Sequence, residues 1–379
     1  MTFANSDLLR WTFSCWAICL CLLLSSDHLV CAEQPPSRGL FVTVIDKQPV
    51  LSSREQIKEL VEFAHKARIK TLFVQVYRAN QAWFPSKMAD QALYKSALKQ
   101  VGEDPFAFLI KQAHARDIQV HAWLNILSLS RNTQAPLLKK YGTSILTKNI
   151  EPKASLKDFE IDSQYFLEPG DLRVRKELGN MVEEVIRAYP DLDGVQFDYI
   201  RYPDSHPAYG YTEMNVGRFK KATGLKTFNE STPAWRDWKR DQVTDLLRKL
   251  VRRARSINDN LHLSTTGCMS YSRAYNEAFQ DWPLWIEKGY AEFVTVMSYP
   301  DTTEEFNKDI DDARKRVRNF KKVYLAAPAY KFPKNPDIFF QQFNLCRASG
   351  AGACVVFHYG SLNVNPLIKQ YIKNIPKTE

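Results

Sequence analysis

The stretch Asp193-Gly194-Val195-Gln196-Phe197-Asp198-Tyr199-Ile200-Arg201-Tyr202-Pro203 decides the fold of this chain of 379 residues. It begins as an apolar strand pattern and ends in a carboxylate, aromatic rings and an arginine. A carboxylate at the end of a buried strand loses solvation free energy unless a partner or a reaction uses it. In barrels of alternating strands and helices, that end of each strand forms the active face. The stretch therefore favours such a barrel, with Asp198 at its mouth.

Apolar runs of strand length alternate with helical patterns eight times along the sequence. Because these runs are almost continuously apolar, they are typical of parallel strands that are covered on both faces. Eight strand–helix repeats predict a closed (β/α)8 barrel, also called a TIM barrel, and a doubly wound open sheet is the alternative. The predicted strands are 40–45, 71–77, 119–126, 194–200, 262–268, 293–299, 323–330 and 353–358.

Capping signals mark two of the helix starts. Ser53 followed by Gln56 has the spacing of a capping box, and an apolar stripe at helical intervals comes after it. Asp104 before Pro105 indicates an N-cap and a first helical residue. The arginine-rich segment 235–256 is predicted to be the long helix after strand four, with a solvated outer face.

Two segments are longer than ordinary connections: 128–168 after strand three and 204–233 after strand four. Both would emerge at the carboxyl ends of their strands, where long loops usually shape a substrate cleft. A single barrel with long loops explains the chain length better than two unrelated domains.

The first 32 residues have the pattern of a secretory signal peptide. Arg10 precedes an apolar run, 11–24, which is shorter than the roughly 20 residues of a membrane-spanning helix. Val30-Cys31-Ala32 offers a cleavage site, so we expect a signal peptide over 1–32 and one catalytic barrel domain over 33–379. Acylation of Cys31 in a lipoprotein is the second alternative, and an uncleaved anchor is the third. The signal predicts a periplasmic or secreted protein that meets the membrane only during export.

Without residues 1–32 the chain is basic. The sequence has 52 Lys and Arg and 42 Asp and Glu, and removal of Arg10, Asp7 and Asp27 leaves 51 minus 40, or +11. This balance suits an anionic polysaccharide as partner, and it is equally typical of an ordinary solvated surface. Nucleic acid is not expected, because the basic residues are spread along the chain and no binding motif accompanies them.

Three cysteines lie beyond residue 32: Cys268, Cys346 and Cys354. Three cysteines do not make a disulfide framework. A bridge between Cys346 and Cys354 is compatible with an oxidising compartment, but both residues lie in apolar segments, where a free buried thiol is the commoner state. The sequence therefore leaves open whether Cys346 and Cys354 are bridged.

Period two along strand four places Gln196 and Asp198 on the same side, so that Asp198 faces the barrel axis near the mouth. We interpret Asp198 as a catalytic group. The alternative is a structural ion pair with Arg201 or Arg78 that closes the top of the barrel.

Hydrolysis of a glycosidic bond at such a site requires a second acid. Asp301 is the best candidate, because it lies just past strand six and shares the parity of Tyr299. A turn residue or helix cap is almost as good an explanation of Asp301. Weaker candidates are Asp46, Asp204 and Glu213.

Other predicted strand ends carry groups that suit sugars. Aromatic rings stack on the flat faces of pyranose rings, and amide or imidazole groups bond hydroxyls. Taken singly, each such residue is more often part of the core, but their coincidence at carboxyl ends predicts a binding site. The candidate substrate-binding residues are Tyr77, Arg78, Trp83, His121, Trp123, Asn125, Tyr199, Arg201, Tyr299 and His358.

Neither a metal nor a cofactor is expected. The sequence lacks a His-Glu-x-x-His pattern, a paired-cysteine motif, a phosphate-binding glycine loop and a Gly-x-Ser-x-Gly elbow. An acidic cluster lacks the spacing of a known calcium loop and is better explained as a solvated segment. Its members are Asp158, Glu160, Asp162, Glu168 and Asp171.

The same residues carry a resemblance to a known family. The chain resembles the glycosyl hydrolase-like 10 family of bacterial proteins over most of the mature sequence, in an ordered set of segments. One departure is Tyr77–Trp83, where family members often have an Arg-Gly-rich segment. The matching segments are 38–43, 71–76, 104–105, 120–125, 167–170 with 174–175, 194–203 and 293–299.

The resemblance implies a (β/α)8 glycoside hydrolase that acts on a bacterial or environmental polysaccharide. It also implies a principal active-site aspartate after strand four, which here is Asp198, and it leaves the second carboxylate open. The resulting hypothesis is an exported glycoside hydrolase with Asp198 as nucleophile or base and Asp301 as general acid. A barrel that binds glycan without cleaving it is the alternative. A lyase or deacetylase is the third reading, and the missing metal-ligand pattern disfavours the deacetylase.

Overall fold

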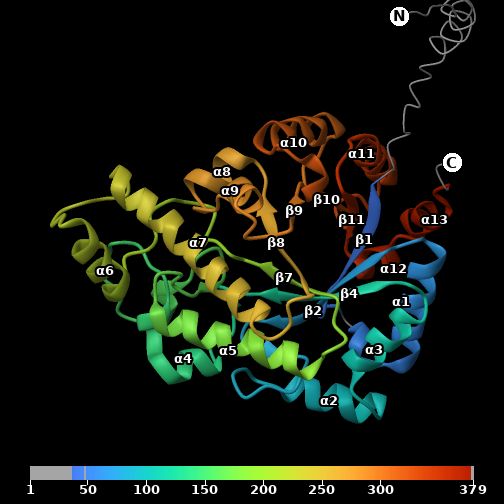
Figure 1. Cartoon of the computed structure of the whole chain (residues 1–379), viewed down its shortest axis with the longest axis horizontal. Coiled ribbons are helices and arrows are strands. Elements are labelled where there is room, and N and C mark those ends of the chain that lie inside the picture. Colours follow the sequence, from blue (N-terminus) through green and yellow to red (C-terminus); the bar gives the residue numbers. More distant parts are fainter. Residues whose placement is uncertain (1–35, 47, 377–379) are drawn as a thin grey trace, which may run out of the picture. The chain divides into compact units, whose positions relative to one another are not determined.

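The computed structural model describes residues 36–46 and 48–376, which form a closed barrel of eight parallel strands (Figure 1). The sheet closes because β1 pairs with β2 on one side and with β11 on the other. The predicted (β/α)8 fold is thus confirmed, and the open sheet is excluded. The barrel strands are β1 Ser37–Val42, β2 Thr71–Arg78, β4 Gln119–Asn125, β7 Gly194–Asp198, β8 His262–Cys268, β9 Phe293–Met297, β10 Val323–Pro328 and β11 Ala353–Phe357.

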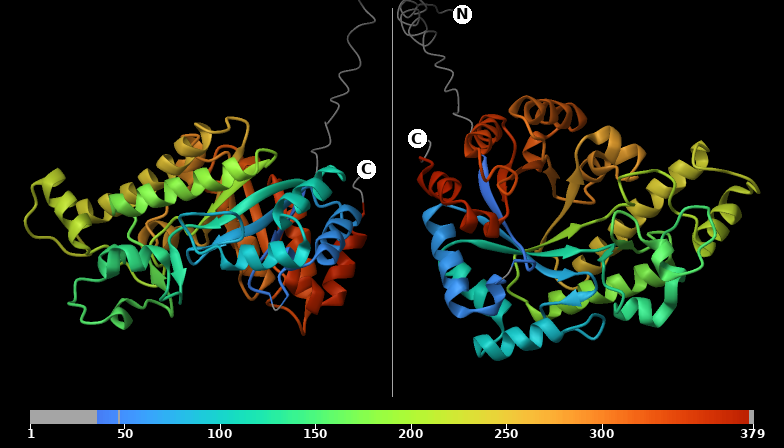
Figure 2. Two further views of the ribbon diagram at one scale, coloured as in Figure 1. Left: turned by 90° about the horizontal axis from the view of Figure 1, so that it is seen from below. Right: turned by 180° about the vertical axis from the view of Figure 1, so that it is seen from behind.

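Helices surround the ring of strands, and further helices lie in the loops (Figures 1 and 2). Most are amphipathic, with one buried face against the barrel and one exposed face. The helices are α1 Arg54–Lys66, α2 Ala92–Val101, α3 Pro105–His114, α4 Pro136–Tyr141, α5 Leu172–Ala188, α6 Glu213–Thr223, α7 Pro233–Arg255, α8 Tyr271–Asn276, α9 Trp282–Glu287, α10 Thr303–Arg316, α11 Pro336–Ala348, α12 Tyr359–Val364 and α13 Pro366–Asn374.

The two predicted caps are present. The Ser53 side chain accepts a hydrogen bond from the backbone N of Gln56 and starts α1. The Asp104 side chain accepts bonds from the backbone N atoms of residues 106 and 107 and starts α3. The long helix α7 begins at Pro233, two residues before the predicted start, because proline suits the first helical turn.

Strand boundaries differ from the prediction mainly at the carboxyl ends. β1 covers 37–42 where 40–45 was expected, since the polar residue Ser37 already pairs with Ala353 of β11. Backbone pairing and not side-chain polarity sets where this strand begins. The apolar residues beyond the observed strand ends belong to loops at the barrel mouth.

The two long segments contain structure of their own. The first holds a small two-stranded sheet, β5 Ser128–Ser130 with β6 Tyr165–Phe166, together with α4. The second holds α6, which packs on α7 through an aromatic cluster around Trp235. α6 and the start of α7 extend beyond the ring of helices on one side, as Figure 1 and the view from below in Figure 2 both show. A two-residue strand, β3 Gln81–Ala82, follows β2.

Side chains that point into the barrel form an aromatic core. Phe41, Phe73, Trp123 and Phe293 pack with small residues of β10 and β11. The rings of Phe41 and Trp123 meet edge to face, with their centroids 4.8 Å apart. This layer fills the barrel below its mouth, so that a ligand can reach the strands only from their ends.

Cys346 and Cys354 form a disulfide bond between α11 and β11, which settles a question that the sequence left open. Both residues are fully buried, as their apolar neighbours indicate. The apolar sequence pattern predicts that both cysteines are buried, but it does not predict that they lie close together. Their proximity follows from the short turn that folds the end of α11 onto the start of β11. Cys268 is free and buried.

The predicted signal peptide falls on residues outside the described part of the chain. The chain divides into two units, Met1–Gln34 and Pro35–Glu379, and the barrel belongs to the second. Within the described residues, no helix combines the length and apolarity needed to cross a membrane.

Candidate active site

Asp198 is the last residue of β7, and its carboxyl group points into the barrel mouth, where it is 2% exposed. Oδ2 accepts a hydrogen bond from Trp123 Nε1 at 2.9 Å. Oδ1 accepts bonds from the Thr266 hydroxyl at 2.5 Å and from the backbone N of Tyr199 at 2.7 Å. Three neighbouring strands therefore hold the carboxyl group in one orientation.

Two opposing effects act on the acidity of Asp198. Burial raises the pKa of its carboxyl group, because the charged form loses hydration. The hydrogen bonds from Thr266, Trp123 and the backbone oppose that rise, as does the positive charge of Arg201. Burial is the larger effect, so Asp198 keeps its proton to a higher pH than an exposed aspartic acid.

Arg201 does not pair with Asp198. Its guanidinium group donates to Asp204 Oδ1 at 2.6 Å and lies over the ring of Tyr199, 4.7 Å from the ring centroid. Arg78 donates to the Ser130 hydroxyl at 3.2 Å. Among the described residues neither arginine forms an ion pair with Asp198, so the alternative of a closing ion pair is not what the structure contains.

Tyr199 takes the left-handed backbone conformation, with φ of 56°. For a residue with a large side chain this conformation is costly and is kept only where the surroundings enforce it. Here it turns the chain sharply after Asp198 and lets the Tyr199 backbone N reach the carboxyl group of Asp198.

A row of polar groups continues from Asp198 around the mouth. Asn125, at the end of β4, lies beside Asp198 in the sheet register and accepts from Gln75 Nε2 at 2.9 Å. Gln75 Oε1 accepts from the backbone N of Val44 at 3.3 Å. This N atom belongs to the loop after β1, so hydrogen bonds link the ends of four consecutive barrel strands.

The row ends in a cluster of Thr43, Asp46 and His358. The Thr43 hydroxyl donates to Asp46 Oδ2 at 2.8 Å and lies 3.4 Å from His358 Nδ1. Asp46 Oδ1 is 3.8 Å from the same imidazole nitrogen. Both ionisable side chains are partly buried, with exposures of 25% for Asp46 and 15% for His358.

Asp301 lies in the turn after β9, and its side chain is 81% exposed. It forms an ion pair with Lys331 at 2.6 Å, and Lys331 also donates to the backbone O of Tyr299. The structure thus gives Asp301 a very different setting from Asp198. Asp301 is surrounded by solvent and a lysine, whereas Asp198 is enclosed by its hydrogen-bond donors.

Aromatic rings line the mouth near Asp301. Tyr299 is half-buried, and its ring packs against Tyr330 and Phe357. Burial raises the pKa of the Tyr299 hydroxyl well above its ordinary value, and the charge of Asp198 contributes to that rise. The ring of Trp123 in turn contacts Phe357 edge to face. These rings bring Tyr299, Trp123 and His358 to one end of the barrel.

Two predicted sugar-stacking residues are instead part of the packing. Tyr77 is 1% exposed, and its hydroxyl accepts from Asn80. Trp83, which follows β3, is 7% exposed within the same core. Tertiary burial of the connection after β2 removes both rings from solvent.

His121 lies at the opposite end of the barrel from Asp198. It lines a cavity of about 230 Å3 together with Thr71, Gln119 and His262, which are the first residues of their strands. Both ring nitrogens are buried and have no hydrogen-bond partner among the described residues. The interpretation of His121 as a substrate contact fails because it sits near the start of β4, whereas Asn125 ends that strand.

The acidic cluster divides into two groups. Asp158, Glu160 and Asp162 are exposed, as expected for a solvated segment, but Glu168 and Asp171 are completely buried. Glu168 accepts from the Tyr202 hydroxyl at 2.5 Å, and Asp171 caps α5. Burial raises the pKa of Glu168. In the described part of the chain no group of three or more such side chains could hold a metal ion.

The weaker acid candidates also have structural partners. Asp204 is shared between Arg201 and Arg273. Glu213 starts α6 and lines a separate groove with Lys148 and Arg173. Asp46 alone of the three lies in the polar row that leads to Asp198.

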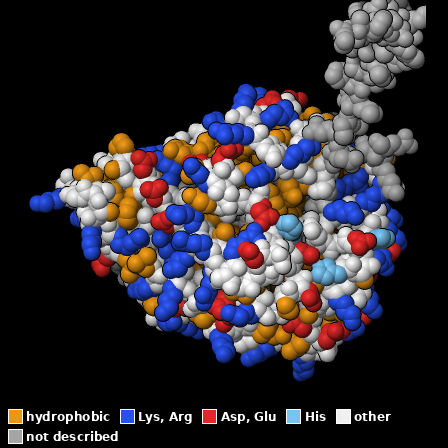
Figure 3. Space-filling view, in the orientation of Figure 1, with side chains coloured by type: hydrophobic (Ala, Val, Ile, Leu, Met, Phe, Trp, Pro, Cys, Tyr) orange, Lys and Arg blue, Asp and Glu red, His pale blue; other side chains and the backbone are white. Residues whose placement is uncertain are grey.

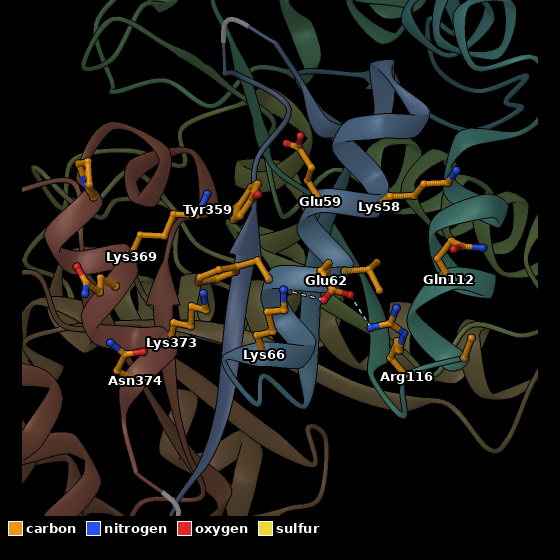
Figure 4. A pocket seen from close by; sticks show the side chains of 15 residues that line it. Lys58, Glu59, Glu62, Lys66, Gln112, Arg116, Tyr359, Lys369, Lys373 and Asn374 are labelled. Atoms are coloured by element: carbon orange, nitrogen blue, oxygen red, sulfur yellow. Dashed lines mark hydrogen bonds and ion pairs between the residues drawn. The ribbon is translucent and has the colours of Figure 1, made fainter.

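Basic side chains are spread over the molecular face in Figure 3, with acidic groups between them. A groove of about 870 Å3 does collect charge on the outer wall between α1, α3 and α13 (Figure 4). There Glu62 pairs with Lys66 and Arg116. Tyr359, which directly follows His358, lines this groove. None of the predicted site residues lines the groove.

Three contributors to the site were not singled out in the sequence: Thr266, Gln75 and Thr43. Each is a polar residue among apolar ones near a strand end. Thr266 has the parity of Ser264, which pairs with Gln196 in the sheet, so register would have placed its hydroxyl near Asp198. The sequence therefore indicates the position of Thr266 only when the register between β7 and β8 is known.

The sequence profile of one family, glycosyl hydrolase-like 10, matches residues 36–337. The chain belongs to this family. The match covers seven of the eight barrel strands, including the end of β7 with Asp198.

Two relatives of known name support the assignment. The chain is 25% identical over 301 residues to glycosyl hydrolase DigH of Escherichia coli strain K12, a match that covers 70% of this chain and 65% of DigH. It is 24% identical over 351 residues to glycosyl hydrolase YngK of Bacillus subtilis strain 168, covering 84% and 66%. The chain thus spans just under two thirds of the length of DigH.

Solved structures show the same fold. The glycoside hydrolase domain of PgaB (BpsB) from Bordetella bronchiseptica superposes with a TM-score of 0.68 at 14% identity, covering 91% of this chain and all of that domain. The catalytic domain of β-amylase from Paenibacillus polymyxa gives a TM-score of 0.58 at 13% identity, covering 90% and 99%. At these identities the likeness concerns the fold alone.

Proposed function

We propose that this protein is an exported glycoside hydrolase that cleaves a polysaccharide at the mouth of its barrel, with the Asp198 carboxyl group taking part in the reaction. One observation carries the proposal: a buried carboxyl group, held by three hydrogen bonds, at the carboxyl end of the fourth barrel strand. Membership of a glycosyl hydrolase-like family supports the reaction class.

The environment of Asp198 suits the role of proton donor. A carboxyl group whose pKa is raised by burial keeps a proton that it can deliver to the departing glycosidic oxygen. This differs from the hypothesis drawn from the sequence, in which Asp198 was the nucleophile or base and Asp301 the general acid. Asp301 is exposed and paired with Lys331, so it lacks the enclosed setting that suits Asp198 to proton donation.

Replacement of Asp198 by Asn tests the proposal. The wild-type protein should release reducing ends from at least one member of a panel of soluble cell-wall and exopolysaccharides, and Asp198→Asn should lose about 10²-fold or more of that activity. Asp162→Asn, in the exposed acidic segment, is the matched control and should match the wild type. Equal activity of Asp198→Asn and wild type would refute the role of Asp198. A wild-type protein that retains a glycan on an affinity gel and yields no product would identify a binding barrel.

Export is supported by the disulfide bond between Cys346 and Cys354, since such bonds persist in oxidising compartments. Cell fractionation of the native host, with a thiol label applied to the separated fractions, tests this part. Recovery of the chain in the cytoplasm with both thiols reactive would contradict export.

A further inference from the structure

The cluster of Thr43, Asp46 and His358 fixes the tautomer of the imidazole. Thr43 uses its only hydroxyl proton to bond Asp46, so towards His358 its oxygen acts as an acceptor. Asp46 faces the same ring nitrogen and also accepts. Nδ1 of His358 therefore carries the proton in the neutral ring, and Nε2 keeps a free lone pair.

Gly360 leaves space for the carboxylate of Asp46, because it has no side chain. A Cβ atom on Gly360 would lie only 2.2 Å from Asp46 Oδ1 and 2.5 Å from Oδ2, so only glycine lets the carboxylate occupy this place. Gly360 belongs to α12, whose N-cap is His358, the residue directly after the end of β11. The loop after β1, which carries Asp46, and the start of the helix after β11 thus hold Asp46 and His358 next to each other.

The strand that precedes His358 lies opposite the strand that ends at Asp198. In the closed ring β11 is four places from β7 in either direction, which is the opposite side, whereas β9 with Asp301 is two places away. Inverting glycosidases hold their acid and base on opposite faces of the sugar, roughly 6.5 to 9.5 Å apart, to leave room for a water molecule. Opposite strands provide that arrangement more readily than strands two places apart.

Burial shifts the pKa values of Asp198 and His358 in opposite directions. Burial raises the pKa of Asp198 and lowers the pKa of His358, an effect that the charge of Asp46 partly opposes. Both shifts favour the neutral forms, a protonated carboxyl group at Asp198 and an imidazole with one unprotonated nitrogen at His358.

We propose that the pair Asp46–His358, and not Asp301, is the catalytic base that works with Asp198, an inference that rests on the proposed function. Nε2 of His358 takes a proton from a water molecule as the water oxygen bonds to the anomeric carbon. The bond from that carbon to the glycosidic oxygen breaks, its electron pair stays on the oxygen, and Asp198 supplies the proton. The imidazolium, stabilised by Asp46, returns its proton through solvent to Asp198. One water is consumed, and the product has inverted configuration.

The tautomer can be tested without substrate. In the 15N-histidine NMR spectrum at neutral pH, the signal that disappears in His358→Gln should show a protonated Nδ1 and a bare Nε2. In Asp46→Asn this preference should weaken, because the acceptor facing Nδ1 loses its charge. A protonated Nε2 in the wild-type protein would overturn the proposal.

The catalytic role is tested with a glycan that the wild-type protein cleaves. His358→Gln should lower kcat by about 10²- to 10⁴-fold with little change in KM, and Asp46→Asn by about 10- to 100-fold. Asp301→Asn should keep most of kcat. Azide, a nucleophile that needs no base, should restore turnover of His358→Gln as a glycosyl azide. NMR of fresh product should show inversion.

Gly360→Ala supplies an independent variant, because its new methyl group displaces the Asp46 carboxylate while every ionisable residue is kept. It should match Asp46→Asn in kcat, whereas Gly217→Ala in α6, with open space around the new methyl group, should match the wild type. Thermal melting of each variant confirms folding.

The outcomes separate the two proposals. Full activity of His358→Gln beside a loss in Asp301→Asn and Asp198→Asn overturns this inference and leaves the hydrolase intact. Retained activity of Asp198→Asn overturns the proposed function itself. If all three variants lose activity, azide rescue decides: rescue of His358→Gln alone supports the pair, and rescue of Asp301→Asn alone refutes it.

Discussion

At the scale of single residues, the donors around Asp198 set how strongly it holds its proton. Trp123 Nε1 and the backbone N of Tyr199 can only donate, so they always favour the ionised carboxylate. The Thr266 hydroxyl can rotate and either donate or accept. Thr266 is therefore the neighbour through which the acidity of Asp198 can be changed with least disturbance to the core.

Thr266→Val keeps the shape of the side chain and removes the hydroxyl. The ionised carboxylate loses a hydrogen bond, so the pKa of Asp198 should rise by about one to two units. For a proton donor this moves the alkaline limb of the pH profile of kcat/KM to higher pH, whereas for a base the acidic limb would move instead. Thr266→Ser keeps the hydroxyl and should leave both limbs in place. A shifted acidic limb would assign Asp198 the role of base.

At the scale of elements, the eight strands could be predicted because a buried parallel strand is a local pattern of apolar residues. Contacts between elements could not, as two residues show. Parity told us that His121 points into the barrel, but not that it lies near the start of β4, far from Asn125 at the end of that strand. Likewise, the apolar setting of Cys354 indicated burial without showing that Cys346 lies within bonding distance. At the site, Asp198 could be predicted from its own segment, whereas its hydrogen bond from Thr266 depends on the pairing of β7 with β8.

The disulfide bond joins α11 to β11 across a separation of 8 residues. A cross-link that closes a loop of this size stabilises the folded state by about 2 to 3 kcal/mol through the entropy of the unfolded chain. The double variant Cys346→Ala/Cys354→Ala should lose about this free energy of unfolding in urea titrations. Addition of reductant should destabilise the wild type and leave the double variant unchanged. Equal stability of the oxidised and reduced wild type would contradict a structural role.

At the scale of the whole molecule, the two ends of the barrel differ in how their polar side chains are hydrogen-bonded. The mouth collects hydrogen-bonded polar groups around Asp198, while the amino-terminal end holds His121 without any hydrogen-bond partner for its ring nitrogens. Its ring stacks on His262 at 6.0 Å, and Glu292 pairs with His262. The proposed catalytic groups at one end and a buried histidine at the other agree with the division between an active face and a stability face in TIM barrels.

That histidine links the stability of the whole protein to pH. Burial lowers the pKa of His121 from 6.5 to about 3. In the unfolded chain the His121 imidazole takes up a proton below pH 6.5, whereas in the folded protein it does so only near pH 3. The free energy of unfolding therefore falls as the pH falls through this window. Between pH 6.5 and 4.5 the loss from His121 should reach about 2 to 3 kcal/mol. His121→Leu removes the titrating group and should flatten this part of the stability profile in urea titrations. His65→Leu, on the exposed face of α1, should leave the profile unchanged. An equally steep profile in His121→Leu would mean that other groups cause the acid sensitivity.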